Sequence, residues 1–396
     1  MRFCKVLDTF FIILLINSAY CDSENKYSDS KKPSDACNGK ENDQNDYCSK
    51  LEAKKLTRLD GVEVGFSREV KVEGDKILHL STLNMKPLLF EIKDFLTKKE
   101  CSHIISLATK VGIKSSVTHQ ETNVDGIRIM DNNGDKMLDI TEMKITIEDN
   151  YDIYLDDADI RTLYADLEID PNKDDIVTKD EMLKLSPKDL RAYLNNLVTT
   201  SPIKKSRFSE QAWIFPNEHK DKLLDTITDR LKNILELPPV LIDKYNAIQV
   251  VHYGRHGHYN AHQDSGSTDQ PCCHLHSNKK CSICRYLTFM LYLNDVEEGG
   301  ETAFPIANNE TFNIHTFRQS GNTHLNSRCN QANLRVKPEL GKAVIWYNHL
   351  VDEETGWLGD LDDYTWHGGC PVTKGTKWIM NRWINVSPDR EIDLRI

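Results

Sequence analysis

The sequence has no excess of basic residues: 50 lysines and arginines face 61 aspartates and glutamates, which leaves a formal net charge of −11. This balance argues against nucleic acid as the main partner, because binding to phosphates requires positive charge. Long hydrophobic runs are also lacking. The apolar stretch from Thr9 to Ile16 is much shorter than the roughly 20 residues that span a bilayer. Membrane association is therefore expected only through this N-terminal segment.

The first residues have the pattern of a secretory signal. Arg2 and Lys5 precede the apolar run, and small or polar residues follow it up to Cys21. We expect residues 1–21 to be a signal peptide, with an uncleaved anchor as the alternative. Eleven cysteines fit an oxidising compartment, so we expect the endoplasmic reticulum lumen or the secretory pathway. Residues 22–55 are polar and poor in aromatics, which predicts a disordered linker.

The stretch HYGRHGHYNAHQD contains a candidate metal-binding pair, His262 and Asp264. On a strand, two residues separated by one position project to the same face, so both side chains could bind one ion. His367, in the run WHGGCP, is our candidate third ligand, with His315 as the main competitor. Two histidines and one carboxylate form the facial triad that holds Fe(II) in non-haem oxygenases.

Lys377 follows His367 by ten residues, in the apolar run KWIMNRWI. Iron held by a facial triad keeps open positions for dioxygen and a bidentate 2-oxo acid. The far carboxylate of a cosubstrate such as 2-oxoglutarate then needs a cation, and Lys377 can supply it. Tyr253 and Tyr292 could offer hydroxyl groups to the same cosubstrate, although plain core packing is the alternative for both.

A second motif occurs twice, in DNNGDKMLDITE and DPNKDDIVTKDE, which both fit the 12-residue calcium loop of an EF-hand. The ligand positions 1, 3, 5, 7, 9 and 12 are occupied by Asp131, Asn133, Asp135, Met137, Asp139 and Glu142 in the first loop, and by Asp170, Asn172, Asp174, Ile176, Thr178 and Glu181 in the second. Position 6 favours glycine, but Lys136 and Asp175 stand there, which argues against tight Ca²⁺ binding.

From residue 247 onward, short apolar runs alternate with turn residues, which indicates antiparallel strands. We expect an α+β protein: a double-stranded β-helix of the jelly-roll or cupin kind, with flanking helices and a helical EF-hand pair. Residues 56–120 would pack on the catalytic domain, residues 121–200 would form the EF-hand pair, and residues 201–396 would form the dioxygenase domain. Helices are expected near residues 97–108, 187–198 and 221–235.

The cysteines after the HxD motif allow two interpretations. Cys272, Cys273, Cys281 and Cys284, together with His274 and His276, could bind zinc, but disulfide bonds that staple an insertion beside the site are preferred. Cys329 and Cys370 form another candidate pair. Asn309 and Asn385 begin glycosylation triplets.

Four segments together resemble the prolyl 4-hydroxylase family of Fe(II)/2-oxoglutarate dioxygenases: HYGRHGHYNAHQD, RYLTFMLYLNDVEEGGETAFP, NLRVKPELGKAVIWYN and DYTWHGGCPVTKGTKWIMNRWIN. The calcium loops and the insertion between Asp264 and Arg285 are most similar to the transmembrane, EF-hand-bearing branch of that family. The resemblance implies that His262, Asp264 and His367 hold iron, that Lys377 binds 2-oxoglutarate, and that L-ascorbate supports turnover.

The leading hypothesis is a calcium-modulated dioxygenase that uses Fe(II), 2-oxoglutarate and O2 to hydroxylate proline in a protein or peptide substrate. One alternative is a calcium-binding lumenal protein with a catalytically silent barrel. Another keeps the chemistry and changes the target to lysyl or other non-prolyl substrates.

Overall fold

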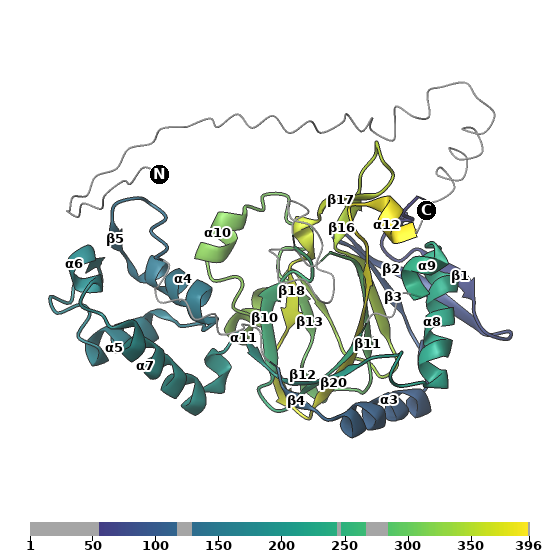
Figure 1. Ribbon diagram of the computed structural model, residues 1–396, viewed down its shortest axis with the longest axis horizontal. Helices are drawn as coiled ribbons and strands as arrows, with labels where there is room; N and C mark the ends of the chain where they lie inside the picture. The colour runs from purple at the N-terminus through teal and green to yellow at the C-terminus, as the bar shows by residue number, and fades with distance from the viewer. Residues whose placement is uncertain (1–54, 117–128, 244–246, 267–283, 395–396) are drawn as a thin grey trace, which may run out of the picture. The chain divides into compact units, whose positions relative to one another are not determined.

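A computed structural model of the protein describes residues 55–116, 129–243, 247–266 and 284–394. The expected signal segment, most of the linker, and Cys272, Cys273 and Cys281 lie outside these residues. Among the described residues, no helix combines the length and the apolar character that crossing a membrane requires. The expectation of a protein that mixes helices and strands is confirmed (Figure 1).

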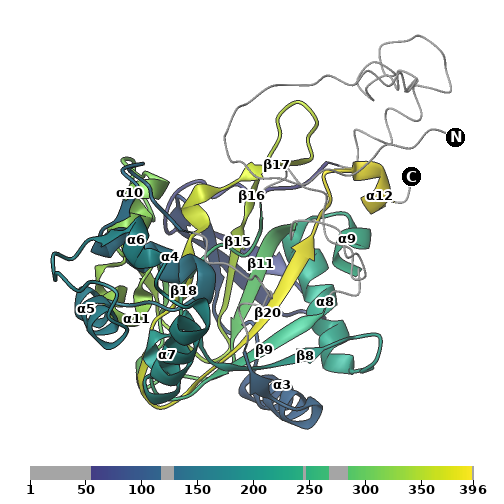
Figure 2. The ribbon, with the colours of Figure 1, turned by 60° about the vertical axis from the view of Figure 1, so that its left-hand side comes forward.

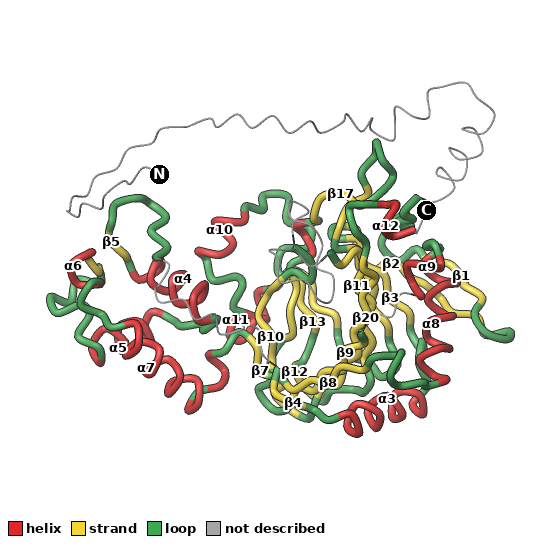
Figure 3. Tube along the Cα trace, in the orientation of Figure 1, coloured by secondary structure: helices red, strands yellow, loops and turns green. Residues whose placement is uncertain are grey.

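Two sheets carry the fold (Figure 3). The nine-stranded sheet has the order β1-β2-β3-β15-β11-β20-β9-β8-β4. Its strands are β1 (Ser67–Lys71), β2 (Ile77–Met85), β3 (Leu88–Ile92), β4 (Lys114–Ser115), β8 (Glu210–Ile214), β9 (Ile248–Tyr253), β11 (Arg285–Tyr292), β15 (Ala343–Tyr347) and β20 (Lys377–Asn385).

The second sheet has five strands in the order β14-β13-β18-β10-β7. They are β7 (Arg207–Phe208), β10 (His258–His262), β13 (Thr302–Phe304), β14 (Leu334–Val336) and β18 (His367–Gly369). Three two-stranded pairs complete the strands: β12 (Glu298–Gly299) with β19 (Val372–Lys374), β16 (His349–Val351) with β17 (Leu358–Leu361), and β5 (Met137–Leu138) with β6 (Val177–Thr178).

Alternation along the central strands decides which side chains face the second sheet. On β11, Met290 and Tyr292 belong to the apolar cluster between the sheets, whereas Phe289 and Leu291 belong to the cluster on the opposite face. Successive side chains of a strand point to opposite faces of the sheet. Because both faces of this central strand are covered, both sets of side chains are buried. The inner cluster forms the wall of the cavity described below.

Helices cover the outer face of the nine-stranded sheet (Figure 2). They are α3 (Lys98–Val111), α8 (Lys222–Leu235) and α9 (Pro239–Asp243). The expected starts of α3 and α8 are confirmed, since Thr97 and Asp221 accept hydrogen bonds from backbone N–H groups of the first turn. On the apolar face of α8, Leu223 is half-buried and Leu224, Ile227, Leu231 and Ile234 are buried. Full burial of such a side chain contributes about 1.5–3 kcal/mol to the free energy of folding.

The region 129–205 forms a helical module with its own apolar core. Its helices are α4 (Ile140–Tyr151), α5 (Asp157–Asp166), α6 (Lys179–Met182), α7 (Pro187–Thr200) and η1 (Pro202–Lys204). Ser186 caps α7 and Pro187 opens it, as expected. An excursion between β13 and β14 contains α10 (Ile314–Gln319), α11 (Leu325–Arg328) and η2 (Cys329–Gln331); η3 (Asp363–Thr365) and α12 (Arg390–Leu394) lie near the end of the chain.

One expectation about the first strands is wrong. Short alternating runs from Leu56 to Arg68 and from Val70 to Leu80 predict strands. Residues 56–66 form no strand, and β1 begins only at Ser67. Leu56 and Leu59 instead pack as buried loop residues, and Leu59 N–H donates to the hydroxyl of Tyr347 at 3.0 Å. Strands β1 to β3 extend the nine-stranded sheet itself, because β3 pairs with β15.

Candidate active site

His262 and His367 meet across two neighbouring strands. They are register partners of the antiparallel pair β10–β18, and their ring centroids lie 4.5 Å apart. Asp264 completes the cluster: its Oδ1 lies 3.7 Å from His262 Nε2, and its Oδ2 lies 3.6 Å from His367 Nε2. Potential ligand atoms of all three residues lie within 4.8 Å of one another, so one ion can reach all three.

The two imidazole rings are held so that Nε2 of each is the metal-facing atom. His262 Nδ1 is 2.9 Å from the carbonyl of Asn260, and His367 Nδ1 is 2.8 Å from the carbonyl of Thr365. A carbonyl only accepts, so each Nδ1 carries the proton and each Nε2 keeps its lone pair. This arrangement is typical of metal-binding histidines. Burial lowers the pKa of His367 to about 4, which keeps its ring neutral and able to bind a metal.

Asp264 does not lie on the strand that holds His262, which corrects the expectation that both project from one strand face. Strand β10 ends at His262. Asp264 is instead fixed by two donors to its Oδ2: Thr288 Oγ1 at 2.7 Å and Trp383 Nε1 at 3.0 Å. Burial opposes ionisation of this carboxyl group, but His367, His262 and Arg285 hold its pKa well below its usual range.

A chain of hydrogen bonds extends behind Asp264. Thr288 Oγ1 accepts from Asn348 Nδ2 at 2.9 Å, and Asn348 Oδ1 accepts from Trp346 Nε1 at 2.9 Å. Thr288 and Asn348 are almost fully buried. The chain of bonds therefore fixes both the position and the ionised state of the carboxylate. In the sequence, the only sign of this role is a hydroxyl group that interrupts the apolar run of β11.

Replacing Thr288 by valine removes the donor to Asp264 while keeping the shape of the side chain. We expect the KM for iron to rise about tenfold, in the range found when outer partners of metal ligands are removed. Steady-state kinetics over a range of iron concentrations measure this. Thr226→Val on α8 is the matched control. An iron KM unchanged within twofold would show that Thr288 does not position Asp264.

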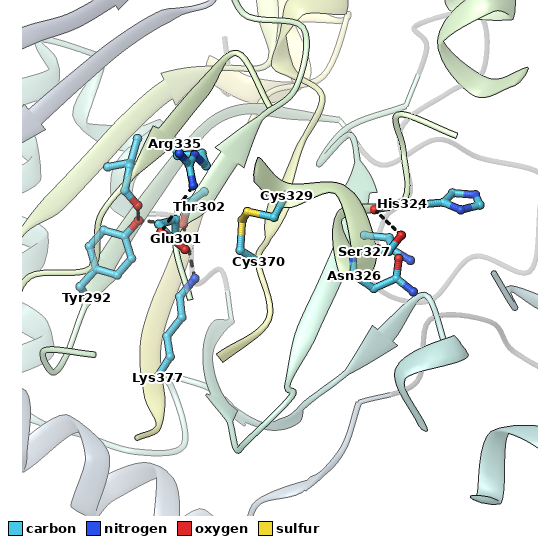
Figure 4. The surroundings of a disulfide bond; sticks show 12 residues. Tyr292, Glu301, Thr302, His324, Asn326, Ser327, Cys329, Arg335, Cys370 and Lys377 are labelled. Carbon is cyan, nitrogen blue, oxygen red and sulfur yellow. Dashed lines mark hydrogen bonds and ion pairs between the residues drawn. A yellow bond between two sulfur atoms is a disulfide. The ribbon is translucent and has the colours of Figure 1, made fainter. Parts of the chain in front are cut away.

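Lys377 is 2% exposed and begins β20. Its Nζ lies 3.5 Å from Thr302 Oγ1 (Figure 4). The same atom lies 5.3 Å from the centroid of the Tyr253 ring and 5.6 Å from that of the Tyr292 ring. Within the described parts of the chain, no carboxylate forms an ion pair with it, and burial lowers its pKa to about 7. An unpaired amine at this depth is well suited to receive an anionic ligand.

A cavity of about 300 Å³ connects these groups. His262, Asp264, His367 and Lys377 all line it, together with Tyr253. Tyr292 is not part of this lining. Its hydroxyl has partners elsewhere, Thr302 Oγ1 at 2.7 Å and the Val336 carbonyl at 3.1 Å. The structure therefore assigns the Tyr292 hydroxyl to the core that surrounds Lys377, rather than to direct contact with a cosubstrate.

Sequence reasoning also missed Arg285, which lines the same cavity. Its guanidinium carbon lies 3.7 Å from the centre of the Trp383 ring, and its Nη1 donates to the Asp264 carbonyl at 3.2 Å. The alternation of β11 could not reveal this contact, because the register of β11 against β20 shifts between Arg285 and Leu287.

The competing histidines have other partners. His258 is buried, and its ring nitrogens Nδ1 and Nε2 lie 2.9 Å and 2.8 Å from the carbonyl oxygens of His256 and Lys205. His349 contacts Ser265. His315 lies on α10, and its side chain is outside the described part of the structure.

The expected disulfide between Cys329 and Cys370 is present (Figure 4). It ties the α10–α11 excursion to the residue that directly follows β18. Cys284 is also disulfide-bonded, which removes it from a zinc site. The other residues of that cysteine cluster lie outside the described residues.

The two calcium-loop motifs adopt similar backbones. Strands β5 and β6 pair the loops, through Met137 with Thr178 and Leu138 with Val177. In the first loop, Asp131, Asp135 and Glu142 bring ligand atoms within 4.8 Å of one another. In the described residues, the acidic groups of the second loop form no such cluster. The position-6 residues, Lys136 and Asp175, have φ values of 67° and 65°, the left-handed conformation that usually requires glycine.

Comparisons with known proteins agree with this geometry. The model of the 2OG-Fe(II) oxygenase superfamily matches residues 248–385. Human transmembrane prolyl 4-hydroxylase is 37% identical over 356 residues, which cover 85% of this chain and 70% of that protein, and the mouse protein is 36% identical over the same lengths. Probable prolyl 4-hydroxylase 3 of Arabidopsis thaliana is 32% identical, covering 47% of this chain and 58% of that protein.

Among solved structures, the 2OG complex of a viral collagen prolyl hydroxylase from Paramecium Bursaria Chlorella virus-1 is 29% identical, with a TM-score of 0.30, and covers 50% of this chain and 90% of that one. The identity to the human and mouse proteins, over more than two thirds of their length, decides the family. The chain belongs to the prolyl 4-hydroxylase family of 2OG-Fe(II) oxygenases.

Proposed function

We propose that this protein hydroxylates prolyl residues in protein or peptide substrates, with iron held by His262, Asp264 and His367 and with 2-oxoglutarate anchored at Lys377. One observation carries this proposal: two imidazole Nε2 atoms and one ionised carboxylate converge beside a buried amine without an ion-pair partner among the described residues. The donor set fits Fe(II). When bound, iron with 2-oxoglutarate and O2 supplies the oxidising chemistry.

The residues of this chain prepare the site. The Asn260 and Thr365 carbonyls keep both histidines in the tautomer that offers Nε2. Thr288 and Trp383 hold Asp264 as a carboxylate through hydrogen bonds to one oxygen. Lys377 binds the far carboxylate of 2-oxoglutarate as an ammonium ion, and the aromatic wall formed by Tyr253 and Trp346 limits access of water.

Formation of succinate tests the reaction class. We expect iron-dependent conversion of 2-oxoglutarate to succinate that increases when a proline-containing peptide is added. The matched control peptide replaces proline by alanine. Equal succinate formation with both peptides would contradict prolyl hydroxylation.

Two further parts of the proposal concern organisation. The two facing sheets would form a jelly-roll barrel, to which residues 56–120 contribute edge strands, and residues 121–200 would form an EF-hand pair.

Disulfide bonds at Cys329–Cys370 and at Cys284 support a secretory or endoplasmic reticulum location, with an N-terminal anchor as the alternative. Ascorbate would support turnover, as the family resemblance implies.

Calcium would bind the loop pair and stabilise the module. We expect Ca²⁺ at about 100 times its Kd to raise the free energy of unfolding by ~2.7 kcal/mol. Glu142→Gln with Glu181→Gln should abolish the shift in Tm seen by differential scanning calorimetry, because both position-12 carboxylates are lost. Asp180→Asn, at a non-ligand position of the second loop, is the control. A Tm of the wild-type protein indifferent to calcium would contradict binding.

A further inference from the structure

An irregularity in the strand pairing lies directly beside the two iron-binding histidines. His262 and His367 are register partners, but the register of β10 against β18 shifts between Tyr259 and His262, so β10 carries a bulge there. Within the bulge, the N–H group of Ala261 donates at 2.9 Å to the carbonyl of Thr323, which lies outside the sheet. Strand pairing alone therefore does not fix the separation of β10 and β18 at the iron site.

The carbonyl that accepts this bond belongs to the excursion between β13 and β14, residues 305–333. Helix α11 of the excursion lies beside β10 (Figure 1). In the first turn of α11, the N–H group of Asn326 donates to Asn260 Oδ1 at 2.8 Å. The carbonyl of the same Asn260 lies 2.9 Å from His262 Nδ1. Asn260 therefore contacts the excursion with its side chain and fixes the His262 ring with its backbone.

The excursion contacts β18 as well. Leu325 is 1% exposed and packs on Gly368, the residue after His367, because a Cβ atom at position 368 would lie only 2.7 Å from Leu325 Cδ1. At the other end of α11, the Cys329–Cys370 disulfide joins the excursion covalently to the residue that follows β18 (Figure 4). Leu325 and Cys370 also share one small apolar cluster. The excursion thus holds both strands that carry the histidines.

We propose that the excursion, closed by the Cys329–Cys370 disulfide, is a positioning element that sets the distance between the two iron-binding histidines. It holds β10 through hydrogen bonds and β18 through the disulfide, at the place where the bulge interrupts the ladder between them. Both cysteines are positioning residues, because they act on iron only through the strands. The inference rests on the proposed iron site and adds to it a covalent determinant of metal affinity.

Metal binding to the full-length protein tests this inference. Fe(II) is titrated without oxygen into the metal-free protein and followed by calorimetry, at a temperature well below Tm. We expect Cys329→Ala with Cys370→Ala to raise the Kd for Fe(II) about tenfold, the lower end of the loss found when outer partners of metal ligands are removed. The visible absorption of the Co²⁺-loaded protein should change in parallel, because it depends on the geometry of the ligand atoms.

Two controls separate positioning from a loss of stability. Ile227→Ala on α8 leaves a cavity on the outer face of the nine-stranded sheet, so it should lower Tm and keep the Kd for Fe(II) within about twofold. Leu325→Ala leaves the disulfide intact but removes the contact with Gly368, and should raise that Kd about threefold to tenfold. Leu325→Met keeps the volume and should restore it. The Leu325 pair carries the test if the double cysteine variant does not fold.

An unchanged Kd for Fe(II) in the folded double cysteine variant would overturn the inference. So would an equal rise in Ile227→Ala, because general destabilisation would then be enough to weaken the site. The proposed reaction fails separately. If iron affinity depends on the excursion in this way but no prolyl peptide is hydroxylated, the positioning role stands and the proposed function does not.

Discussion

Replacing His262 by alanine is expected to remove iron and to lower turnover by more than about a hundredfold. Removing only an outer partner of a metal ligand costs about 10- to 100-fold, and removing a ligand itself should cost more. The ring is fixed by the Asn260 carbonyl and presents Nε2 to the other two ligands, so no neighbouring side chain replaces it. Because His262 is only half-buried, the variant should fold. Iron content by atomic absorption and succinate formation measure the effect.

His252→Gln provides the matched control for this prediction. His252 lies on β9, faces Glu210 at 2.9 Å and is absent from the lining of the iron cavity, so its loss should leave iron content unchanged. Full iron occupancy and normal turnover of His262→Ala would refute the assignment of the ligands.

Lys377→Met is expected to weaken 2-oxoglutarate binding and to stabilise the ligand-free protein at the same time. Loss of the ammonium should raise the Kd for 2-oxoglutarate at least about 30-fold, since a desolvated charge pair is worth ~2 kcal/mol or more. Methionine fills a similar volume without a buried charge. Isothermal calorimetry and urea unfolding measure the two effects, with Lys374→Met, an exposed lysine on β19, as control.

The effect on stability has a defined dependence on pH. The pKa of Lys377 is about 7 in the folded protein, against ~10.4 in an unfolded chain. Below pH 7 both states hold the proton, and the folded state bears the full cost of a buried ammonium, roughly 5 kcal/mol. Between pH 7 and ~10.4 the unfolded chain binds the additional proton, so this contribution to stability rises with pH. The stability advantage of Lys377→Met over the wild-type protein should therefore shrink as pH increases through this window.

Binding of 2-oxoglutarate should be linked to the same group. At pH 8 the amine is mostly neutral, so binding of the carboxylate should draw close to one proton from the buffer; at pH 6 it should draw almost none. Calorimetry in buffers of different ionisation enthalpy measures the uptake. Uptake that persists in Lys377→Met would show that another residue receives the carboxylate.

Much of the fold follows from local patterns. Helix α8 can be predicted from the sequence because Asp221 can cap it and its apolar residues recur on one face. Strands β11 and β20 can be predicted because they are apolar runs between turns. The attachment of β1 to β3 to the large sheet depends on pairing between residues about 250 positions apart, which no local pattern encodes. The start of β1 was misjudged because alternation also occurs in loops that bury single leucines.

Some residues of the site can likewise be predicted from the sequence, and others cannot. The sequence indicates His262, Asp264, His367 and Lys377, because an HxD pair with a later histidine, and a lysine within an apolar run, are chemically unusual in their surroundings. It does not indicate Thr288 or Arg285, which act through contacts with Asp264 made only after folding. For Tyr292 the sequence left two interpretations open, and the structure favours core packing, because its hydroxyl bonds Thr302 and Val336.

Isotope transfer from dioxygen tests the central claim most directly. The iron-loaded protein is incubated with 2-oxoglutarate, ¹⁸O2 and a peptide that contains a single proline, and fragment masses locate the label. The account predicts one ¹⁸O atom on the proline ring, absent with His262→Ala. Label on another residue, or succinate formed without any label in the peptide, would contradict it.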